Sequence, residues 1–227
     1  MQRWQTVICL IYLPIHMFLL PRVLPVYLEA SGVTDVGQMN FAYYAMGIML
    51  MFATCLGYLR AEFDPLVERL GQCILTFFMA LGIDYILSLA VNSVVLSVTN
   101  GVDNPNDTLV MELLAQSRGY MRAAGIFMAP IVEEVLFRGA LFGSIRKRSR
   151  ILAYVVCVLV FALYHVWDYV VQSGDWRLLI YVLQYAPVGI ALTWAYERSG
   201  CIWVSIGFHA MINYTSFALE KVAAELM

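Results

Sequence analysis

The sequence contains few charged residues: Asp, Glu, Lys and Arg make up 13% of its 227 residues, against about 25% in ordinary soluble domains. Hydrophobic residues make up 62%, and the mean hydropathy is +0.75. A soluble domain of this length could not bury so much apolar surface, so we predict a polytopic membrane protein. The formal net charge of −2 gives no indication of a nucleic-acid partner.

Several signatures of metal, redox and secreted proteins are missing as well. The five cysteines are scattered through apolar segments without a CxxC spacing, which predicts buried free thiols rather than a metal cluster. Neither the HExxH motif of zinc peptidases nor a GxGD-like stretch occurs. The N-terminal segment has no small-residue cleavage site near its end, so we expect a retained span. We find no repeats and no separate soluble domain.

The chain does contain seven apolar stretches of about 20 residues, the length that a bilayer requires. They run roughly 5–28, 38–60, 72–99, 121–145, 151–172, 178–197 and 201–220. We therefore predict an all-α fold, a polytopic transmembrane helical bundle of about seven spans. Within this one membrane domain, residues 1–100 hold the N-terminal spans and residues 101–227 form the rest of the membrane core.

Local signals refine these elements. Pro14, Pro21 and Pro25 predict a kink or break in the first span. Residues 61–71 are expected to lie along the membrane surface. Residues 106–116 predict a short amphipathic helix capped by Asn106 or Asp107.

The lysine and arginine residues predict the orientation. The basic segment "RKRSR" at 146–150 lies between two spans and should face the cytoplasm. Alternation of the spans from that point puts about twice as many basic residues inside as outside. We therefore expect a cytoplasmic N-terminus, and the short loops favour a bacterial plasma membrane.

Three spans carry polar residues at a shared depth. Glu133, His165 and His209 lie about 20, 22 and 17 Å from the nearest basic residue at the predicted cytoplasmic boundary, at a rise of about 1.5 Å per residue. Ionisable residues this deep usually face the protein interior or a water-filled cavity. A single polar site near the bilayer midplane requires such a shared depth.

Spacing along each helix assigns partners. Glu134 and Arg138 are four residues apart, so they lie on one face and can pair. Glu133 points about 100° away from Glu134 around the helix, and it is left free to do chemistry. Phe161 with His165, and His209 with Asn213, repeat the four-residue spacing.

The stretches "EEVLFRG", "FALYH" and "HAMIN" resemble the EExxxR, FxxxH and HxxxN/B motifs of the CPBP intramembrane proteases. This family includes the type II CAAX prenyl endopeptidases and the bacterial Abi-type membrane proteases. All three motifs occur in family order on separate predicted helices, and the resemblance covers about residues 120–217.

Peptide hydrolysis needs an activated water and a group that stabilises the oxyanion. The resemblance implies that Glu133 and His165 act on the water and that His209 and Asn213 stabilise the oxyanion. Glu134, Arg138 and Phe161 would support the site, the first two as an ion pair and the third as a wall against water. We expect no cofactor.

A metal version is the alternative to this mechanism. Glu133, His165 and His209 form a Glu plus two His set, which can hold catalytic zinc with one open position. The chain lacks HExxH, the spacing that would favour zinc strongly, and the chemistry of these residues together with the family resemblance favours the metal-free glutamate mechanism.

Two functions of other classes compete with an intramembrane endopeptidase. One is a non-catalytic scaffold or bacteriocin-immunity protein on the same fold. The other is a proton-coupled transporter, since membrane Glu and His residues also form proton relays; no inverted repeat is visible to favour it. The expected partners are a hydrophobic or lipid-modified peptide or protein substrate and membrane lipids.

Overall fold

The described part of the protein is built from helices alone. The computed structural model describes residues 1–102 and 104–226, with side chains up to residue 218. Within these ranges every regular element is helical, so the predicted all-α fold is confirmed. The elements follow one another as α1 (Arg3–Pro14), η1 (Ile15–Leu19), α2 (Leu20–Ala30), α3 (Val36–Ala61), α4 (Asp64–Glu68), α5 (Leu70–Thr99), α6 (Pro105–Gln116), α7 (Arg118–Arg122), η2 (Ala123–Met128), α8 (Ala129–Glu134), η3 (Val135–Phe142), α9 (Gly143–Ile145), α10 (Arg150–Ser173), η4 (Trp176–Tyr181), α11 (Val182–Ser199) and α12 (Ile202–Leu226).

Consecutive elements join into seven long helical stretches, close to the predicted ranges. Among the described residues, five stretches are long and apolar enough to cross a bilayer: Arg3–Ala30, Val36–Glu68, Leu70–Thr99, Arg150–Ser173 and Trp176–Ser199. The other two, residues 118–145 and α12, are the ones that carry "EEVLFRG" and "HAMIN". The protein is an integral membrane protein, and the count of seven spans stays a prediction.

The first stretch bends locally without breaking. Pro14 is followed by a π-helical turn, η1, and Pro21 and Pro25 are accommodated within α2. Proline lacks the N–H that an α-helix needs for one of its hydrogen bonds. In a π turn the hydrogen bonds span five residues instead of four, so the helix continues past this position with a local bend. The predicted surface segment at 61–71 contains the short helix α4.

The expected cap of the short helix α6 was wrong. Asn104, not Asn106 or Asp107, is the cap: its side chain accepts a hydrogen bond from the Asn106 backbone N–H at 3.1 Å. Pro105 then occupies the first helical position, where its missing N–H costs nothing.

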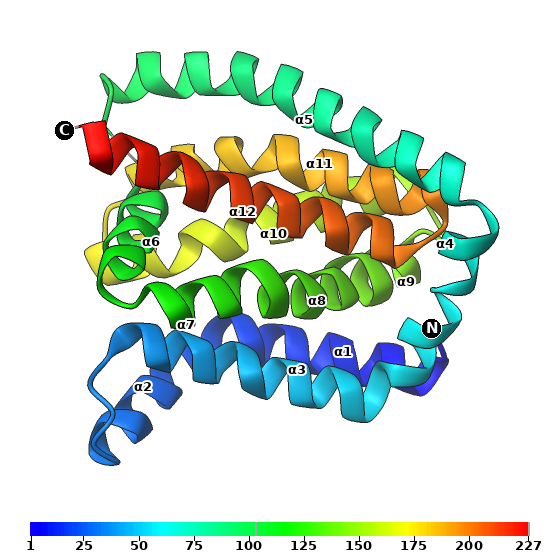
Figure 1. The fold of residues 1–227 in the computed structure, drawn as a ribbon, viewed down its shortest axis with the longest axis horizontal. Helices are drawn as coiled ribbons and strands as arrows, with labels where there is room; N and C mark the ends of the chain where they lie inside the picture. The colour runs from blue at the N-terminus through cyan, green and yellow to red at the C-terminus, as the bar shows by residue number, and fades with distance from the viewer. Residues whose placement is uncertain (103, 227) are drawn as a thin grey trace.

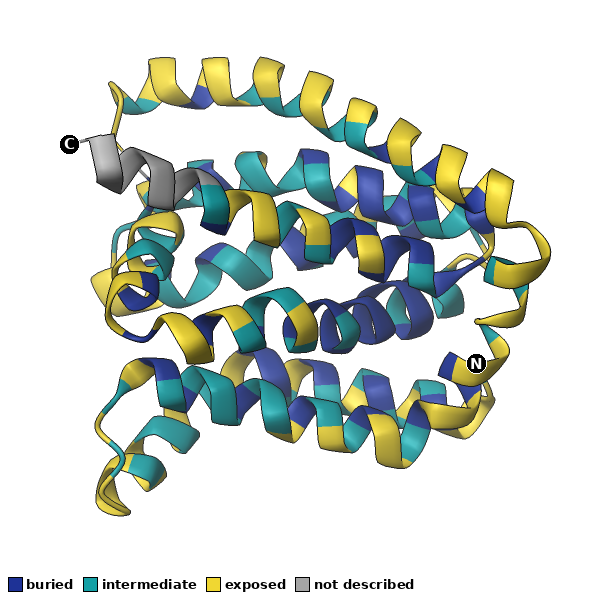
Figure 2. Ribbon diagram, in the orientation of Figure 1, coloured by how far each residue is buried: buried dark blue, intermediate teal, exposed yellow. Residues whose placement is uncertain are grey.

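The stretch from α7 to α9 lies at the centre of the bundle. It packs against α1 and α3 on one side and against α10 and α12 on the other, so it lies between helices that are far apart in sequence (Figure 1). Its C-terminal half is the most continuously buried part of the ribbon in Figure 2. Helix α5, by contrast, lies at the edge and is largely exposed, as expected for a lipid-facing span.

Candidate active site

The central stretch holds three ionisable side chains in its most buried part. Glu133 is 2% exposed, and Glu134 and Arg138 are fully buried. Glu133 and Glu134 end α8, and Arg138 lies in the π-helical segment η3. Charged groups inside a membrane protein are costly, so they are retained where they pair with one another or serve a function, and π-helical turns are frequent at functional sites.

Glu134 is the hub of a buried polar network. Arg138 Nη1 donates to Glu134 Oε1 at 2.9 Å, as the four-residue spacing predicted. His209 Nδ1 lies 2.8 Å from the same oxygen, and the Ser205 hydroxyl donates to Oε2 at 2.5 Å. Glu134 therefore ties α12 to the central stretch and fixes the His209 ring.

Arg138 and Phe161 form the next layer of the network. Arg138 Nη2 donates to the Gly189 carbonyl at 3.3 Å. The central carbon of the guanidinium, Cζ, lies 4.4 Å from the centre of the Phe161 ring. The same ring lies 4.7 Å from that of His165 and 6.0 Å from that of His209. Phe161 is thus placed between the arginine and both histidines, where it can restrict access of water.

Glu133 points its two oxygens to different neighbours. The Tyr44 hydroxyl donates to Oε1 at 2.8 Å. Oε2 has no hydrogen-bond partner among the described residues, although it is buried, and it lies 3.8 Å from His209 Nε2. The two ring nitrogens of His209 therefore face different carboxylates: Nδ1 faces Glu134, and Nε2 faces Glu133.

His165 has one committed and one free nitrogen. Its Nδ1 lies 2.9 Å from the Phe161 carbonyl, and a carbonyl can only accept, so Nδ1 carries the proton. In the neutral ring, Nε2 is then an acceptor. The ring stacks on Tyr185, with centroids 4.4 Å apart and planes at 18°. No direct hydrogen bond joins His165 to Glu133 among the described residues.

Asn213 lies one turn beyond His209 on α12. Its amide nitrogen donates to the Gly125 carbonyl at 2.7 Å, which leaves its second N–H and its oxygen uncommitted. Gly125 permits the close approach of α12 and η2, since a Cβ atom there would lie 2.7 Å from the Phe217 ring. Asn213 is therefore anchored to the backbone of η2, and no hydrogen bond within the described part of the chain joins it to Glu133.

The set Glu133, His165 and His209 does not form a metal site as it stands. In the described part of the chain, no three His, Cys, Asp or Glu side chains are grouped closely enough to hold a metal ion. His165 and His209 each use Nδ1 on a protein acceptor, the Phe161 carbonyl or the Glu134 carboxylate, and this leaves Nε2 of both rings available. Histidines that bind a metal are commonly held in the same way, so the choice between the metal-free and the metal version stays a prediction.

The sequence prediction missed four residues of this site: Tyr44, Tyr164, Tyr185 and Ser205. Ser205 did have a signal, because it lies four residues before His209 and so shares its helical face. Tyr164 directly precedes His165 within "FALYH", which places it near the site, whereas Tyr44 and Tyr185 had no signal among the 14 tyrosines of the chain.

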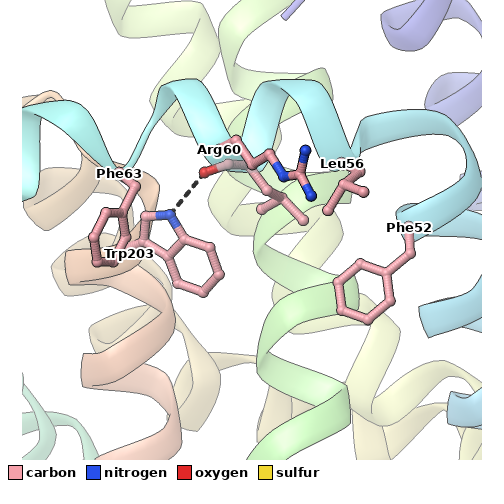
Figure 3. A pocket seen from close by; sticks show the side chains of 6 residues that line it. Phe52, Leu56, Arg60, Phe63 and Trp203 are labelled. Atoms are coloured by element: carbon pink, nitrogen blue, oxygen red, sulfur yellow. Dashed lines mark hydrogen bonds between the residues drawn. The ribbon is translucent and has the colours of Figure 1, made fainter.

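An apolar pocket lies away from this cluster, at the C-terminal end of α3 and against α12 (Figure 3). There the Trp203 indole N–H donates to the Leu59 carbonyl at 2.9 Å. The pocket is lined by Phe52, Leu56, Leu59, Arg60, Phe63 and Trp203. None of the predicted site residues lines it.

Fold and site together define a polytopic membrane protein with a buried glutamate–histidine cluster. Residues 116–215 match the family of type II CAAX prenyl endopeptidase Rce1-like proteins. This segment includes all three motifs, so the resemblance predicted from them is confirmed.

Two curated bacterial proteins are similar to the chain. "Putative membrane peptidase YdiL" of Bacillus subtilis (strain 168) is 25% identical over 114 residues, which cover 50% of this chain and 42% of that protein. "UPF0177 protein YxdF" of Lactococcus lactis subsp. lactis (strain IL1403) is 26% identical over 173 residues, which cover 73% of this chain and 86% of that protein. No solved structure matches the chain.

Proposed function

We propose that the protein is an intramembrane endopeptidase that hydrolyses peptide bonds of membrane-associated substrates. One observation carries this proposal: the unpartnered oxygen of buried Glu133 faces His209 Nε2 at 3.8 Å. The second glutamate holds that histidine in place. The match to the Rce1-like family and the name of the Bacillus relative support a peptidase.

Glu133 is the general base in this proposal. Its Oε2 takes a proton from water while the water oxygen forms a bond to the carbonyl carbon of the peptide. His165 orients the same water, because its Nε2 can accept a hydrogen bond from the second O–H of that water. Protein hydrogen bonds hold both side chains, Glu133 through the Tyr44 hydroxyl and His165 through the Phe161 carbonyl of its own helix.

His209 and Asn213 stabilise the tetrahedral oxyanion. His209 Nδ1 faces a carboxylate that is already paired with Arg138, so this nitrogen carries a proton. To donate to the oxyanion, Nε2 must carry one as well, which makes the ring an imidazolium. Glu133 and Glu134 flank that cation, and with Arg138 the four groups have no net charge, as a buried cluster requires.

The intermediate then collapses as the C–N bond breaks. The proton that Glu133 took from water goes to the departing amine, so the carboxylate is regenerated and no group is consumed. Until the C–N bond breaks, the oxyanion is held by two donors, His209 Nε2 and the uncommitted N–H of Asn213. Loss of one such donor typically costs about 100- to 1000-fold in rate.

We propose a hydrophobic or lipid-modified peptide as the substrate class. A buried site within a helical bundle favours a substrate that partitions into the bilayer. A prenylated chain and a bacterial precursor peptide both meet this requirement. We place the protein in the bacterial plasma membrane with a cytoplasmic N-terminus, on the basis of its basic residues and its bacterial relatives.

A peptidomic comparison tests the function. Membranes from cells that carry the wild-type protein, Glu133→Gln or the control Glu68→Gln are compared, because Glu68 lies on the exposed helix α4. We expect a set of cleaved peptides that disappears with Glu133→Gln and persists with Glu68→Gln. Identical peptides in all three membranes would refute the peptidase and leave a scaffold or transporter role.

A further inference from the structure

A chain of hydrogen-bonded groups to which the motifs assign no role ends on Glu133. The Tyr44 hydroxyl contacts Glu133 Oε1 at 2.8 Å and the Tyr164 hydroxyl at 3.0 Å. The Tyr164 hydroxyl lies 3.4 Å from His16 Nε2. These groups come from α3, α10 and η1, so three helical elements contribute to a chain that ends on one oxygen of the central carboxylate.

The chain is held in a buried aromatic cluster. His16 is fully buried and stacks on Tyr43, with ring centroids 4.4 Å apart and planes at 16°. The Tyr43 hydroxyl donates to the His16 carbonyl at 2.9 Å. The rings of Tyr43 and Tyr44 meet edge to face at 4.8 Å. The cluster thus fixes the ring that carries the hydroxyl next to Glu133.

The direction of each hydrogen bond follows from the carboxylate. A carboxylate only accepts, so the single proton of the Tyr44 hydroxyl is committed to Glu133. The Tyr164 hydroxyl has one proton and two neighbouring hydroxyls, Tyr44 at 3.0 Å and Tyr43 at 3.2 Å. Directed to the nearer oxygen, this proton goes to Tyr44, and Tyr164 in turn accepts from His16 Nε2. His16 Nδ1 is left without a proton, which agrees with its having no hydrogen-bond partner among the described residues. Three donors in series therefore point towards Oε1.

We propose that Tyr44 is a positioning residue for Glu133 and that Tyr164 orients Tyr44. By donating to Oε1, the phenol makes Oε2 the more basic oxygen, the one without a donor among the described residues, and it directs this oxygen towards His209 Nε2. Hydrogen bonds that polarise one another in series hold such a geometry better than an isolated one. This inference rests on the proposed function of Glu133.

The test compares single hydroxyl deletions in the full-length protein in proteoliposomes. The substrate is a fluorogenic peptide with a cleavage sequence recovered from the peptidomic comparison. Tyr44→Phe should lower kcat roughly tenfold to 100-fold, the range for loss of one hydrogen bond to a charged group, with little change in KM. Tyr164→Phe keeps the bond to Glu133 and should give a smaller loss in kcat.

A matched control is available in the same part of the bundle. Tyr12 also has a buried hydroxyl, but this hydroxyl has no hydrogen-bond partner among the described residues. Tyr12→Phe should therefore keep the wild-type kcat. Thermal unfolding of each variant in detergent identifies any loss that comes from misfolding, and Tyr164→Phe still tests the proposal if Tyr44→Phe does not fold.

The pH–rate profile separates positioning from a merely structural role. Glu133 is faced by Tyr43 and Tyr44 from α3, by Tyr164 from α10, by His209 from α12, and by Glu134 and Arg138 from its own helical stretch. Tyr44→Phe removes only the hydroxyl that donates to Glu133. Loss of a donor disfavours the charged carboxylate, so the acidic limb of the profile should move to higher pH. A structural role would leave this limb in place.

The two proposals fail in different ways. If the wild type and Glu133→Gln cleave the peptide equally, the proposed function is wrong. If Glu133→Gln abolishes cleavage but folded Tyr44→Phe keeps the wild-type kcat and pH profile, only the positioning role is wrong.

Discussion

Replacement of Arg138 by methionine tests whether the second glutamate is structural. Arg138 is fully buried, pairs with Glu134 at 2.9 Å and lies over the Phe161 ring at 4.4 Å. Methionine fills much of the same volume without a charge. The variant Arg138→Met therefore leaves the Glu134 carboxylate buried without its guanidinium, while Ser205 and His209 still contact it.

The expected loss of stability is large. Removing one partner of a buried ion pair typically costs about 3–5 kcal/mol, because the other charge stays uncompensated. For a chain of this length, 1 kcal/mol corresponds to about 2–4 °C in Tm. We therefore expect Arg138→Met to lower the Tm by roughly 6–20 °C.

A second substitution identifies the cause. Glu134→Gln in the Arg138→Met background removes the unpaired charge, so it should restore a substantial part of the lost stability. The assay is thermal unfolding of purified variants in one detergent, followed by intrinsic tryptophan fluorescence. A single variant as stable as the wild type, or a double variant less stable than Arg138→Met, would refute the assignment of Glu134 and Arg138 as a structural pair.

Three further predictions address the rest of the molecule. Asn213→Ala should lower kcat about 100- to 1000-fold with unchanged folding; an unaltered kcat would exclude it as an oxyanion donor. Prolonged dialysis against a chelator should leave cleavage unchanged, whereas stoichiometric zinc lost together with activity would favour the metal version. The Ser117 hydroxyl, at 2.6 Å, holds the pKa of Asp35 below its usual value. The hydrogen bond between Ser117 and ionised Asp35 therefore stabilises the folded protein at neutral pH, and this contribution is lost as the pH falls through the lowered pKa of Asp35. Ser117→Ala should therefore lower the Tm at pH 7 and match the wild type in strong acid; an equal difference at both pH values would contradict this.

Helix positions were predictable because apolar length and turn residues act locally. Gly174 and Gly200 end α10 and α11 in the left-handed conformation, and Ser149 caps α10. These residue types mark helix ends in a sequence without knowledge of the packing. The π-helical segments η2 and η3 were not predictable, since they depend on packing across the bundle. The cap at Asn104 was missed because the helix was predicted to start after Pro105, although Pro is favoured directly after a capping residue.

The candidate site was predictable to the extent that it follows helix periodicity. The four-residue spacing identified the contact between Glu134 and Arg138. It could not show that His209 bridges both glutamates, because that depends on how α12 packs on α8. Nor could it single out Tyr44 or Tyr164, whose roles arise only when α3 and α10 meet next to Glu133.

The positions of ordered water around Glu133 test the central claim most directly. The measurement is a map of the protein in lipid nanodiscs, at a resolution that shows individual waters. We predict one water within hydrogen-bond distance of Glu133 Oε2 and within reach of His165 Nε2, with Oε1 on the Tyr44 hydroxyl. A carboxylate that faces lipid, or an Oε2 in contact with protein atoms alone, would contradict a hydrolytic site at this position.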